Sequence, residues 1–233
     1  MNIAVIPARG GSKRIPRKNI KSFYGKPMIA WSIEVALESG CFEQVIVSSD
    51  DEEISDVARS YGAEVPFIRP ARLADDHTGN TQVIAHAVNW FKNQIGELSA
   101  VCCIHATAPF IKKIDLIKAY NIFNTNKWNY VFASTTFGYP IQRAFMKLET
   151  GGIKMFNPEH FETRSQDLHE AYHDAGMFYW GKTDAWLGNI KTFSEKSTII
   201  KIPPYRVVDI DTEEDWARAE LIMEILEREE KSP

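Results

Sequence analysis

Two groups of residues in this sequence could do chemistry, and the first is a glycine turn crowded with cations. A short apolar run, residues 3–6, leads almost directly into Gly10 and Gly11. Glycine lacks a Cβ, so such a turn can bring its backbone N–H groups against an anion. The accompanying positive charges are carried by Arg9, Lys13, Arg14, Arg17 and Lys18. This pattern predicts a polyphosphate site, and an ordinary tight turn with a solvated basic loop is the alternative.

The second group is a pair of carboxylates near the end of the chain, Asp209 and Asp211. If residues 207–211 end a strand, its period of two places both aspartates on one face. Mg²⁺ is commonly held by one or two carboxylates together with substrate phosphates and water. The alternative is a capping box formed by Thr212 and Asp215, but that box leaves the two preceding aspartates unexplained. We therefore predict a magnesium site at the pair and assign Asp215 to the cap.

A third acidic candidate, Asp50, follows the apolar run at residues 45–49. It could be a metal ligand or contact a ribose. It also stands where a helix N-cap belongs, and capping alone explains an aspartate there. We therefore favour the cap.

Strands and helices alternate along the chain. Apolar runs predict strands at 3–6, 45–50, 65–68, 100–104 and 130–133, with a further strand end at 207–211. Helical spacing predicts helices at 27–38, 51–61, 81–93 and 113–125, with a last helix through residue 227. The alternation predicts an α/β fold with a doubly wound, mostly parallel sheet. Such a sheet binds its ligand at the carboxyl ends of its strands.

At 233 residues the chain is best read as a single domain, residues 1–233. The regular pattern stops at about 136–170, where Gly and Pro separate short pieces rich in aromatic and charged residues. An excursion of this kind suits a lid or a dimer arm.

Composition limits the partners and the location. A net charge of −4 argues against a nucleic-acid surface. No apolar run approaches the ~20 residues that span a bilayer, and no leader pattern precedes the first strand. Cys41, Cys102 and Cys103 have no metal-site spacing and are expected to be buried free thiols, which fits a cytoplasmic protein.

The opening of the chain strongly resembles that of the CMP-sugar synthetases, the cytidylyltransferases that activate nonulosonic acids such as sialic acid. The match covers Ile-Pro-Ala-Arg-Gly-Gly-Ser-Lys at 6–13 and Ile-Pro-Arg-Lys-Asn at 15–19. Lys18 matches the lysine nearest the reacting phosphate in this family. The resemblance implies that the nucleotide is bound by Ala8, Arg9, Gly10, Gly11, Ser12, Lys13, Lys18 and Asn19, and that Arg9, Lys18 and Asp211 are catalytic.

Later segments extend the resemblance over nearly the whole chain. Residues 69–76 resemble the segment that holds the cytosine base, so Arg69 is expected to read the base edge; a solvent-facing arginine is the alternative. His105 stands where sialic-acid members have glutamine, and Thr107 matches the family pattern. Both are expected to contact the sugar, although a lone histidine is more often structural.

The His-Asp-Ala-Gly string at 173–176, followed by aromatic residues, resembles the pseudaminic acid cytidylyltransferases rather than the sialic-acid members, and so does Arg14. His173 and Asp174 are expected to position substrate. Neighbours in sequence seldom have the geometry of a catalytic relay. The sugar pocket is expected to use some of the nearby apolar residues, but alternation alone does not say which of Phe110, Met177, Phe178 and Tyr179 face it.

The resemblance implies transfer of CMP from CTP to a nonulosonic acid, with pseudaminic acid favoured, Mg²⁺ held by Asp209 and Asp211, and a homodimer with a protruding arm. One alternative is the same reaction on N-acetylneuraminic acid, keto-deoxyoctulosonate or a phosphorylated polyol. Another is a nucleotide-binding module without turnover. The presence of Lys18, Asp209 and Asp211 together argues against this second alternative.

Overall fold

The computed structural model describes residues 1–231 and folds them around a six-stranded sheet. In spatial order the strands are β10 (Ser197–Lys201), β6 (Tyr130–Thr136), β9 (Tyr172–Lys182), β5 (Ala100–Ile104), β1 (Asn2–Pro7) and β4 (Gln44–Ser48). Strand β9 runs antiparallel to both of its neighbours, and the remaining pairs of this sheet are parallel. The mostly parallel sheet confirms the predicted fold class.

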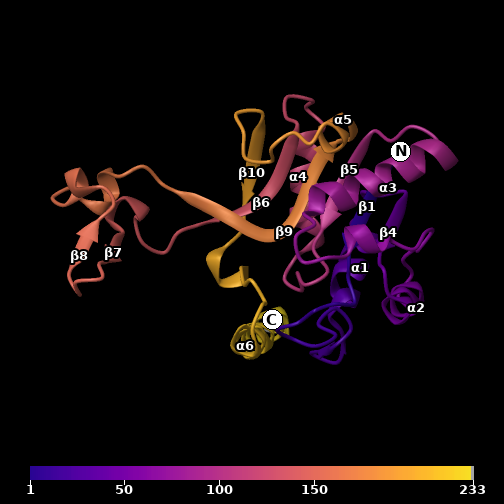
Figure 1. Ribbon diagram of the computed structural model, residues 1–233, viewed down its shortest axis with the longest axis horizontal. Coiled ribbons are helices and arrows are strands. Elements are labelled where there is room, and N and C mark those ends of the chain that lie inside the picture. Colours follow the sequence, from indigo (N-terminus) through magenta and orange to yellow (C-terminus); the bar gives the residue numbers. More distant parts are fainter. Residues whose placement is uncertain (232–233) are drawn as a thin grey trace.

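Helices cover both faces of this sheet (Figure 1). They are α1 (Met28–Ser39), α2 (Glu52–Ser60), α3 (Asn80–Gln94), α4 (Lys113–Phe123), α5 (Thr183–Leu187) and α6 (Glu213–Lys231). The core on one face contains side chains of α1, α2, α4 and α6, and the core on the other contains side chains of α3 and α5. The chain is therefore doubly wound, as predicted. None of the described helices is both long and apolar enough to cross a bilayer.

The alternation of side chains along the central strands explains the two cores. Cys102 and Cys103 are neighbours in β5, and they pack into opposite cores because strand side chains alternate. Both are buried free thiols, as the sequence predicted, whereas Cys41 is a free thiol that is only half-buried. The strand is buried along its whole length, which accounts for its continuous apolar run.

Two predicted strands are wrong. At 65–68 the chain makes only isolated bridges, through Glu64 and Ile68, because Pro66 has no N–H to donate to a ladder. Residues 207–211 form a loop after the 3-10 turn η5 (Pro204–Arg206). The sequence also missed β10, which occupies the sheet edge beside β6.

The irregular excursion forms a protrusion (Figure 1). Between β6 and β9 the chain extends away from the sheet and carries a small hairpin of β7 (Phe145–Lys147) and β8 (Ile153–Met155) (Figure 1). A second small hairpin, β2 (Ser22–Phe23) with β3 (Lys26–Pro27), precedes α1.

The directions of the strands bring the candidate residues together on the side of the sheet where the parallel strands end. The parallel strands β1, β4 and β5 end there, and the antiparallel strand β9 begins there. The loops after β1 and β5 and the first residues of β9 therefore meet. Open α/β sheets bind their ligands on this side, outside the carboxyl ends of the strands.

Candidate active site

The loop after β1 approaches a carboxylate so closely at one position that only glycine fits there. The N–H of Gly10 donates to Oδ1 of Asp50 at 3.2 Å. A Cβ on Gly10 would lie only 2.6 Å from Oδ2 of Asp51, whereas a Cβ on Gly11 would meet open space. The close approach of backbone to carboxylate therefore explains Gly10, and Gly11 is not needed for packing.

The helix N-cap that the sequence assigned to Asp50 is formed by Asp51. The N-cap of α2 is Asp51, whose Oδ1 accepts a hydrogen bond from the N–H of Ile54 at 3.0 Å. Asp51 also forms an ion pair with Arg17 at 2.5 Å, and the hydrogen bond from Arg17 is the main cause of the lowered pKa of Asp51. The predicted cap at Asp50 is therefore wrong, because the helix begins one residue later and leaves Asp50 to hold the glycine loop.

The same loop is tied down at its two ends. The N–H of Ala8 donates to the carbonyl of Ser48 at 3.0 Å, which extends the ladder between β1 and β4. The buried amide of Asn19 donates to the carbonyl of Arg9 at 3.0 Å. Ala8 and Asn19 therefore shape the loop.

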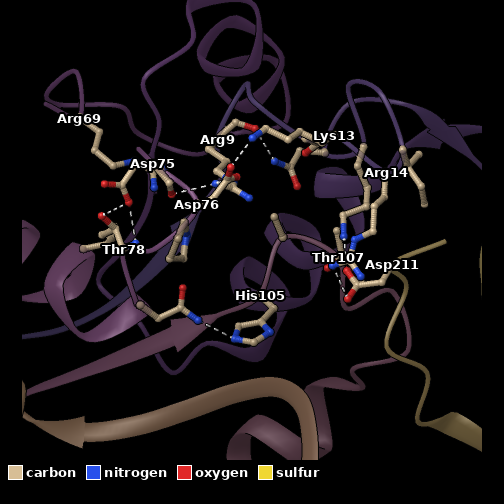
Figure 2. A pocket seen from close by; sticks show the side chains of 18 of the residues that line it. Arg9, Lys13, Arg14, Arg69, Asp75, Asp76, Thr78, His105, Thr107 and Asp211 are labelled. Carbon is tan, nitrogen blue, oxygen red and sulfur yellow. Dashed lines mark hydrogen bonds and ion pairs between the residues drawn. The ribbon is translucent and has the colours of Figure 1, made fainter. Parts of the chain in front are cut away.

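A polar cavity of about 300 Å³ opens above this loop (Figure 2). The structure brings together most of the residues predicted to bind the nucleotide or contact the reacting phosphate. Those lining the cavity are Arg9, Ser12, Lys13, Lys18, Asn19, Arg69 and Asp211. Arg14 also lines it, and so do His105 and Thr107, which were predicted to contact the sugar. Ala8, Gly10 and Gly11 are not among the residues that line this cavity.

Two of the cations converge on one carboxylate. Arg9 forms an ion pair with Asp76 at 2.8 Å and donates to the carbonyl of Asp75, also at 2.8 Å. Lys13 pairs with the other oxygen of Asp76. Hydrogen bonds from Lys13 and Arg9 lower the pKa of Asp76. Exposed pairs of this kind contribute little stability, so an incoming phosphate could replace Asp76 between the two cations.

Two further cations of the loop converge on Asp211. Lys18 donates from Nζ to Oδ1 of Asp211 at 3.0 Å and to the carbonyl of Ile210 at 2.7 Å. Arg14 contacts Oδ2 of Asp211 at 2.7 Å. Both oxygens of this carboxylate therefore face a cation, and the glycine loop is joined to the loop before α6.

Asp209 lies on the far side of this contact, in the lining of a second cavity. Partial burial, followed by the charge of Asp211, raises the pKa of Asp209. The two carboxylates therefore interact, although their predicted strand geometry is wrong because residues 207–211 are a loop. A nearby divalent cation would relieve their repulsion.

The donor set fits Mg²⁺ bound with its substrate rather than by protein alone. Among the described residues there is no cluster of three or more His, Cys, Asp or Glu that could hold a metal. Mg²⁺ commonly takes one or two carboxylates and completes its six oxygens with phosphates and water. Asp209 and Asp211 beside a cationic cavity supply such a pair of carboxylates.

The capping box at the start of α6 is confirmed. Oδ2 of Asp215 accepts from the N–H of Thr212 at 2.8 Å, and the N–H of Asp215 donates to Oγ1 of Thr212 at 3.2 Å. Oδ2 of Asp215 also accepts from the N–H of Asp211 at 3.1 Å. The cap therefore fixes the backbone of the adjacent carboxylate loop.

Arg69 lines the first cavity but is only 4% exposed. It donates to the carbonyl of Ser48 at 2.8 Å and lies 4.0 Å from Asp50. Burial lowers the pKa of its guanidinium. The alternative of a solvent-facing arginine is wrong, because the buried side chain is hydrogen-bonded to the end of β4. Recognition of the cytosine base by Arg69 remains a prediction.

The second cavity, of about 480 Å³, adjoins the first. His105 lines both. The residues that line the second cavity include His105, His173, Asp174, Gly176, Asp209, Asp215 and Arg218. The structure thus places the predicted sugar-binding residues His173 and Asp174 apart from the nucleotide-binding residues, while Thr107 lies with the latter.

His105 lies between the two cavities, and its surroundings favour the neutral ring. Nε2 accepts a hydrogen bond from the amide of Asn80 at 2.9 Å, because that amide nitrogen can only donate. The proton therefore sits on Nδ1, which lies beside the backbone of Gly176. Burial lowers the pKa of His105, and the charges of nearby carboxylates only partly offset this effect.

His173 and Asp174 do not form a relay. Nδ1 of His173 is hydrogen-bonded to the backbone carbonyl of Asp174, not to its carboxylate, and the ring packs 4.8 Å from that of Phe137. The carboxylate of Asp174 accepts from the N–H of Gly176 and from the hydroxyl of Tyr179. Substrate positioning by this pair remains a prediction.

Sequence reasoning missed the ion pair that supports the carboxylate loop. Arg206 is buried, and its guanidinium donates to both oxygens of Asp115 at 2.7 and 3.1 Å. It also donates to the carbonyl of Phe110 at 3.2 Å. No local signal marks this pair, because its members are 91 residues apart.

The fold and the site define a nucleotide-binding α/β class, and the comparisons identify the family. In fold, the chain is similar to the solved CMP:2-keto-3-deoxy-manno-octonic acid synthetase complexed with CTP, with a TM-score of 0.70, 16% identity, and coverage of 97% of this chain and 99% of that one. The family model described as Cytidylyltransferase matches residues 3–205. The chain belongs to the cytidylyltransferase family.

Two curated relatives span nearly the whole chain. The pseudaminic acid cytidylyltransferase of Campylobacter jejuni is 48% identical, with 96% of this chain and 97% of the relative covered. The CMP-N,N'-diacetyllegionaminic acid synthase of Legionella pneumophila is 31% identical, with 96% of each covered.

Proposed function

We propose that this chain transfers CMP from CTP to the anomeric hydroxyl of a nonulosonic acid, with pseudaminic acid as the preferred acceptor, and releases pyrophosphate. The observation that carries the proposal is the arrangement of two cavities around the Lys18–Asp211 contact. One cavity is cationic and follows a glycine loop, the other is polar, and His105 lines both. A triphosphate in the first would place its α-phosphate near an acceptor in the second.

The first cavity supplies the groups that a triphosphate needs. The N–H groups of Gly11 and Ser12 and the cations Arg9 and Lys13 would hold the phosphates, with Asp76 displaced. Lys18 would face the reacting phosphate and neutralise charge as the pyrophosphate departs. Transfer of this kind depends mainly on positioning and charge, so the chain needs no covalent nucleophile.

Asp209 and Asp211 would hold Mg²⁺ at the boundary between the cavities. When bound, this ion stabilises phosphate charge and lowers the pKa of the attacking hydroxyl. Both carboxylates are set on a short loop that the buried Arg206–Asp115 pair and the Thr212 cap hold in place. The loop would thus present its carboxylate oxygens to the metal ion without a rearrangement of the core.

Three observations support pseudaminic acid as acceptor. The relative from Campylobacter jejuni carries that name and is 48% identical. The second cavity contains His105, His173 and Asp174, the residues at which the sequence departs from the sialic-acid pattern. Tyr179 faces this cavity's residues, since its ring lies 5.5 Å from that of His105, whereas Phe178 is buried in the core.

We also propose that the protrusion pairs two copies of the chain. It exposes large apolar side chains, among them Tyr139, which is 87% exposed, and Phe145, Ile153 and Phe161. Apolar surface of this extent commonly marks an interface. A cytoplasmic location, which suits the free thiols, belongs to the same proposal. Light scattering should give twice the chain mass, and Phe145→Glu with Ile153→Glu should give the mass of one chain.

The reaction itself is tested with CTP, Mg²⁺ and pseudaminic acid. We expect pyrophosphate and a CMP-sugar in equal amounts, identified by mass, and much weaker turnover with UTP, ATP or GTP. Binding of CTP without any pyrophosphate release, whatever the nonulosonic acid, would contradict the proposal and favour a nucleotide-binding module.

A further inference from the structure

The second cavity carries a large negative charge. Asp174, Asp209 and Asp215 all line it. A nonulosonic acid has a carboxylate on the carbon that bears its anomeric hydroxyl, so it must enter this cavity as an anion. Like charges in a partly desolvated site repel, and a further carboxylate therefore needs a cation to accompany it.

Arg218, in the second turn of α6, supplies that cation. Among the described residues that line the second cavity, it alone carries a permanent positive charge. The residue is exposed, and within the described part of the chain its guanidinium makes no hydrogen bond or ion pair. Its charge contributes to the lowered pKa of Asp215, after the hydrogen bonds from Thr212 and Asp211, so the guanidinium lies near that carboxylate. Its donors remain available to a ligand.

The other cations of the site are engaged elsewhere. Arg14 and Lys18 contact Asp211, and Arg9 and Lys13 contact Asp76. All four line the first cavity, where the triphosphate would require them. Among the described residues that line the second cavity, Arg218 is therefore the permanently charged cation that can bind an anion there.

We propose that Arg218 binds the carboxylate of the acceptor and is a specificity-determining residue, an inference that rests on the proposed function. A guanidinium can donate two parallel hydrogen bonds to a carboxylate, which fixes its orientation as well as its position. Because the carboxylate and the anomeric hydroxyl share one carbon, this contact would aim the hydroxyl at the first cavity. It would also select acids over neutral sugars.

The test compares pseudaminic acid with its methyl ester in the wild type and in Arg218→Ala, with Mg²⁺ and saturating CTP. In the wild type we expect the ester to lose about 10- to 100-fold in kcat/KM, the range of a charged hydrogen bond. Arg218→Ala should lose a similar factor with the acid, mainly through the KM for the acceptor, and should hardly distinguish acid from ester. Any electronic effect of the ester acts on both enzymes and cancels in the comparison.

Two further variants sharpen the comparison. Arg218→Lys keeps the charge but not the paired donors, so it should recover only part of the discrimination. Arg228→Ala removes another arginine of α6, whose side chain is 81% exposed and pairs with Glu224 at 3.8 Å, and it should behave as the wild type. The KM for CTP should stay the same in all three variants, since the first cavity is unchanged.

The outcomes separate this inference from the proposed function. If Arg218→Ala turns over the acid and discriminates against the ester as strongly as the wild type does, Arg218 does not bind the carboxylate. If the wild type releases no pyrophosphate with any nonulosonic acid, the proposed function itself fails and takes this inference with it. Circular dichroism of each variant would detect a folding defect. Arg218→Gln is a second test, because Gln has a helix propensity similar to that of Arg but carries no charge.

Discussion

Lys18 and Asp211 are nearly two hundred residues apart in sequence, yet the ammonium of Lys18 donates to Oδ1 of Asp211 at 3.0 Å. The lysine side chain is 18% exposed and the aspartate 31%, so the contact faces the cavity and is not part of the core. It places the residue proposed to stabilise the transferring phosphate next to a carboxylate proposed to hold Mg²⁺. The account of catalysis depends on this contact.

Asp211→Asn should abolish most turnover while the protein remains folded. The amide keeps the shape of the side chain but removes the charge that faces Lys18 and Arg14 and that is proposed to hold a divalent cation. We expect kcat to fall by about 100-fold or more, measured as pyrophosphate release across a Mg²⁺ titration. Turnover near that of the wild type, with an unchanged Mg²⁺ dependence, would show that Asp211 is not a metal ligand.

A matched control for that experiment is Asp215→Asn, four residues further on. Asp215 is a cap, so its loss should lower Tm by about 2–4 °C and change Mg²⁺ dependence little. Differential scanning calorimetry and the same titration separate the two aspartates. A large rise in the Mg²⁺ requirement of Asp215→Asn would extend the metal site to this residue.

Lys18→Ala should lower kcat far more than it weakens CTP binding. Charge that is used mainly in the transition state affects kcat, whereas charge used equally in the ground state affects KM. We expect a fall in kcat of about 100-fold or more for Lys18→Ala. Lys13→Ala, which removes one of the two cations that pair with Asp76, should mainly raise the KM for CTP. The reverse pattern in steady-state kinetics would mean that Lys13 is nearer the reacting phosphate.

Gly10→Ala and Gly11→Ala should differ sharply although they are neighbours. The new Cβ at residue 10 would lie 2.6 Å from Oδ2 of Asp51, which Arg17 and the helix cap hold in place. We expect Gly10→Ala to destabilise the protein by about 1–3 kcal/mol in urea unfolding and to weaken CTP binding. Gly11→Ala meets open space and should keep both properties. Equal behaviour of the two variants would contradict the described loop.

His105 should titrate below the value of 6.5 expected for a free histidine. Burial is the main cause of its lowered pKa. The hydrogen bond that the amide of Asn80 donates favours the neutral ring as well. The resulting contribution to stability is present above pH 6.5 and is lost as the pH falls through the folded-state pKa. Nitrogen chemical shifts should show the proton on Nδ1 at pH 7, and Asn80→Ala should raise the pKa. A doubly protonated ring at pH 7 would contradict this assignment.

The residues of the glycine loop are contiguous, so the sequence alone could predict that they lie together. Ser12, Lys13 and Lys18 all face the cavity that the charge pattern indicated. Features that depend on contacts between residues far apart in the chain could not be predicted from the sequence. The antiparallel direction of β9 follows from sheet packing, and the Arg206–Asp115 pair joins segments 91 residues apart.

The other errors concern the exact residues at which helices and strands begin and end. Asp50 and Asp51 differ by one position, and only the observed start of α2 decides which of them caps the helix. Asp209 and Asp211 were correctly placed near one another, but on a strand that is in fact a loop. Spacing in sequence therefore identified the chemical groups and gave the wrong geometry between them.

The most direct test of the central claim is the ratio of kcat/KM for pseudaminic acid to that for N-acetylneuraminic acid, under matched CTP and Mg²⁺. Pseudaminic acid has a terminal methyl group and a second acylamino group, and a pocket built for a methyl rejects a hydroxyl by only about 100-fold. We therefore expect a ratio well above one, and we expect His173→Ala to lose more activity with pseudaminic acid than with N-acetylneuraminic acid. Equal or better use of N-acetylneuraminic acid would contradict the proposed acceptor and leave only the cytidylyltransferase.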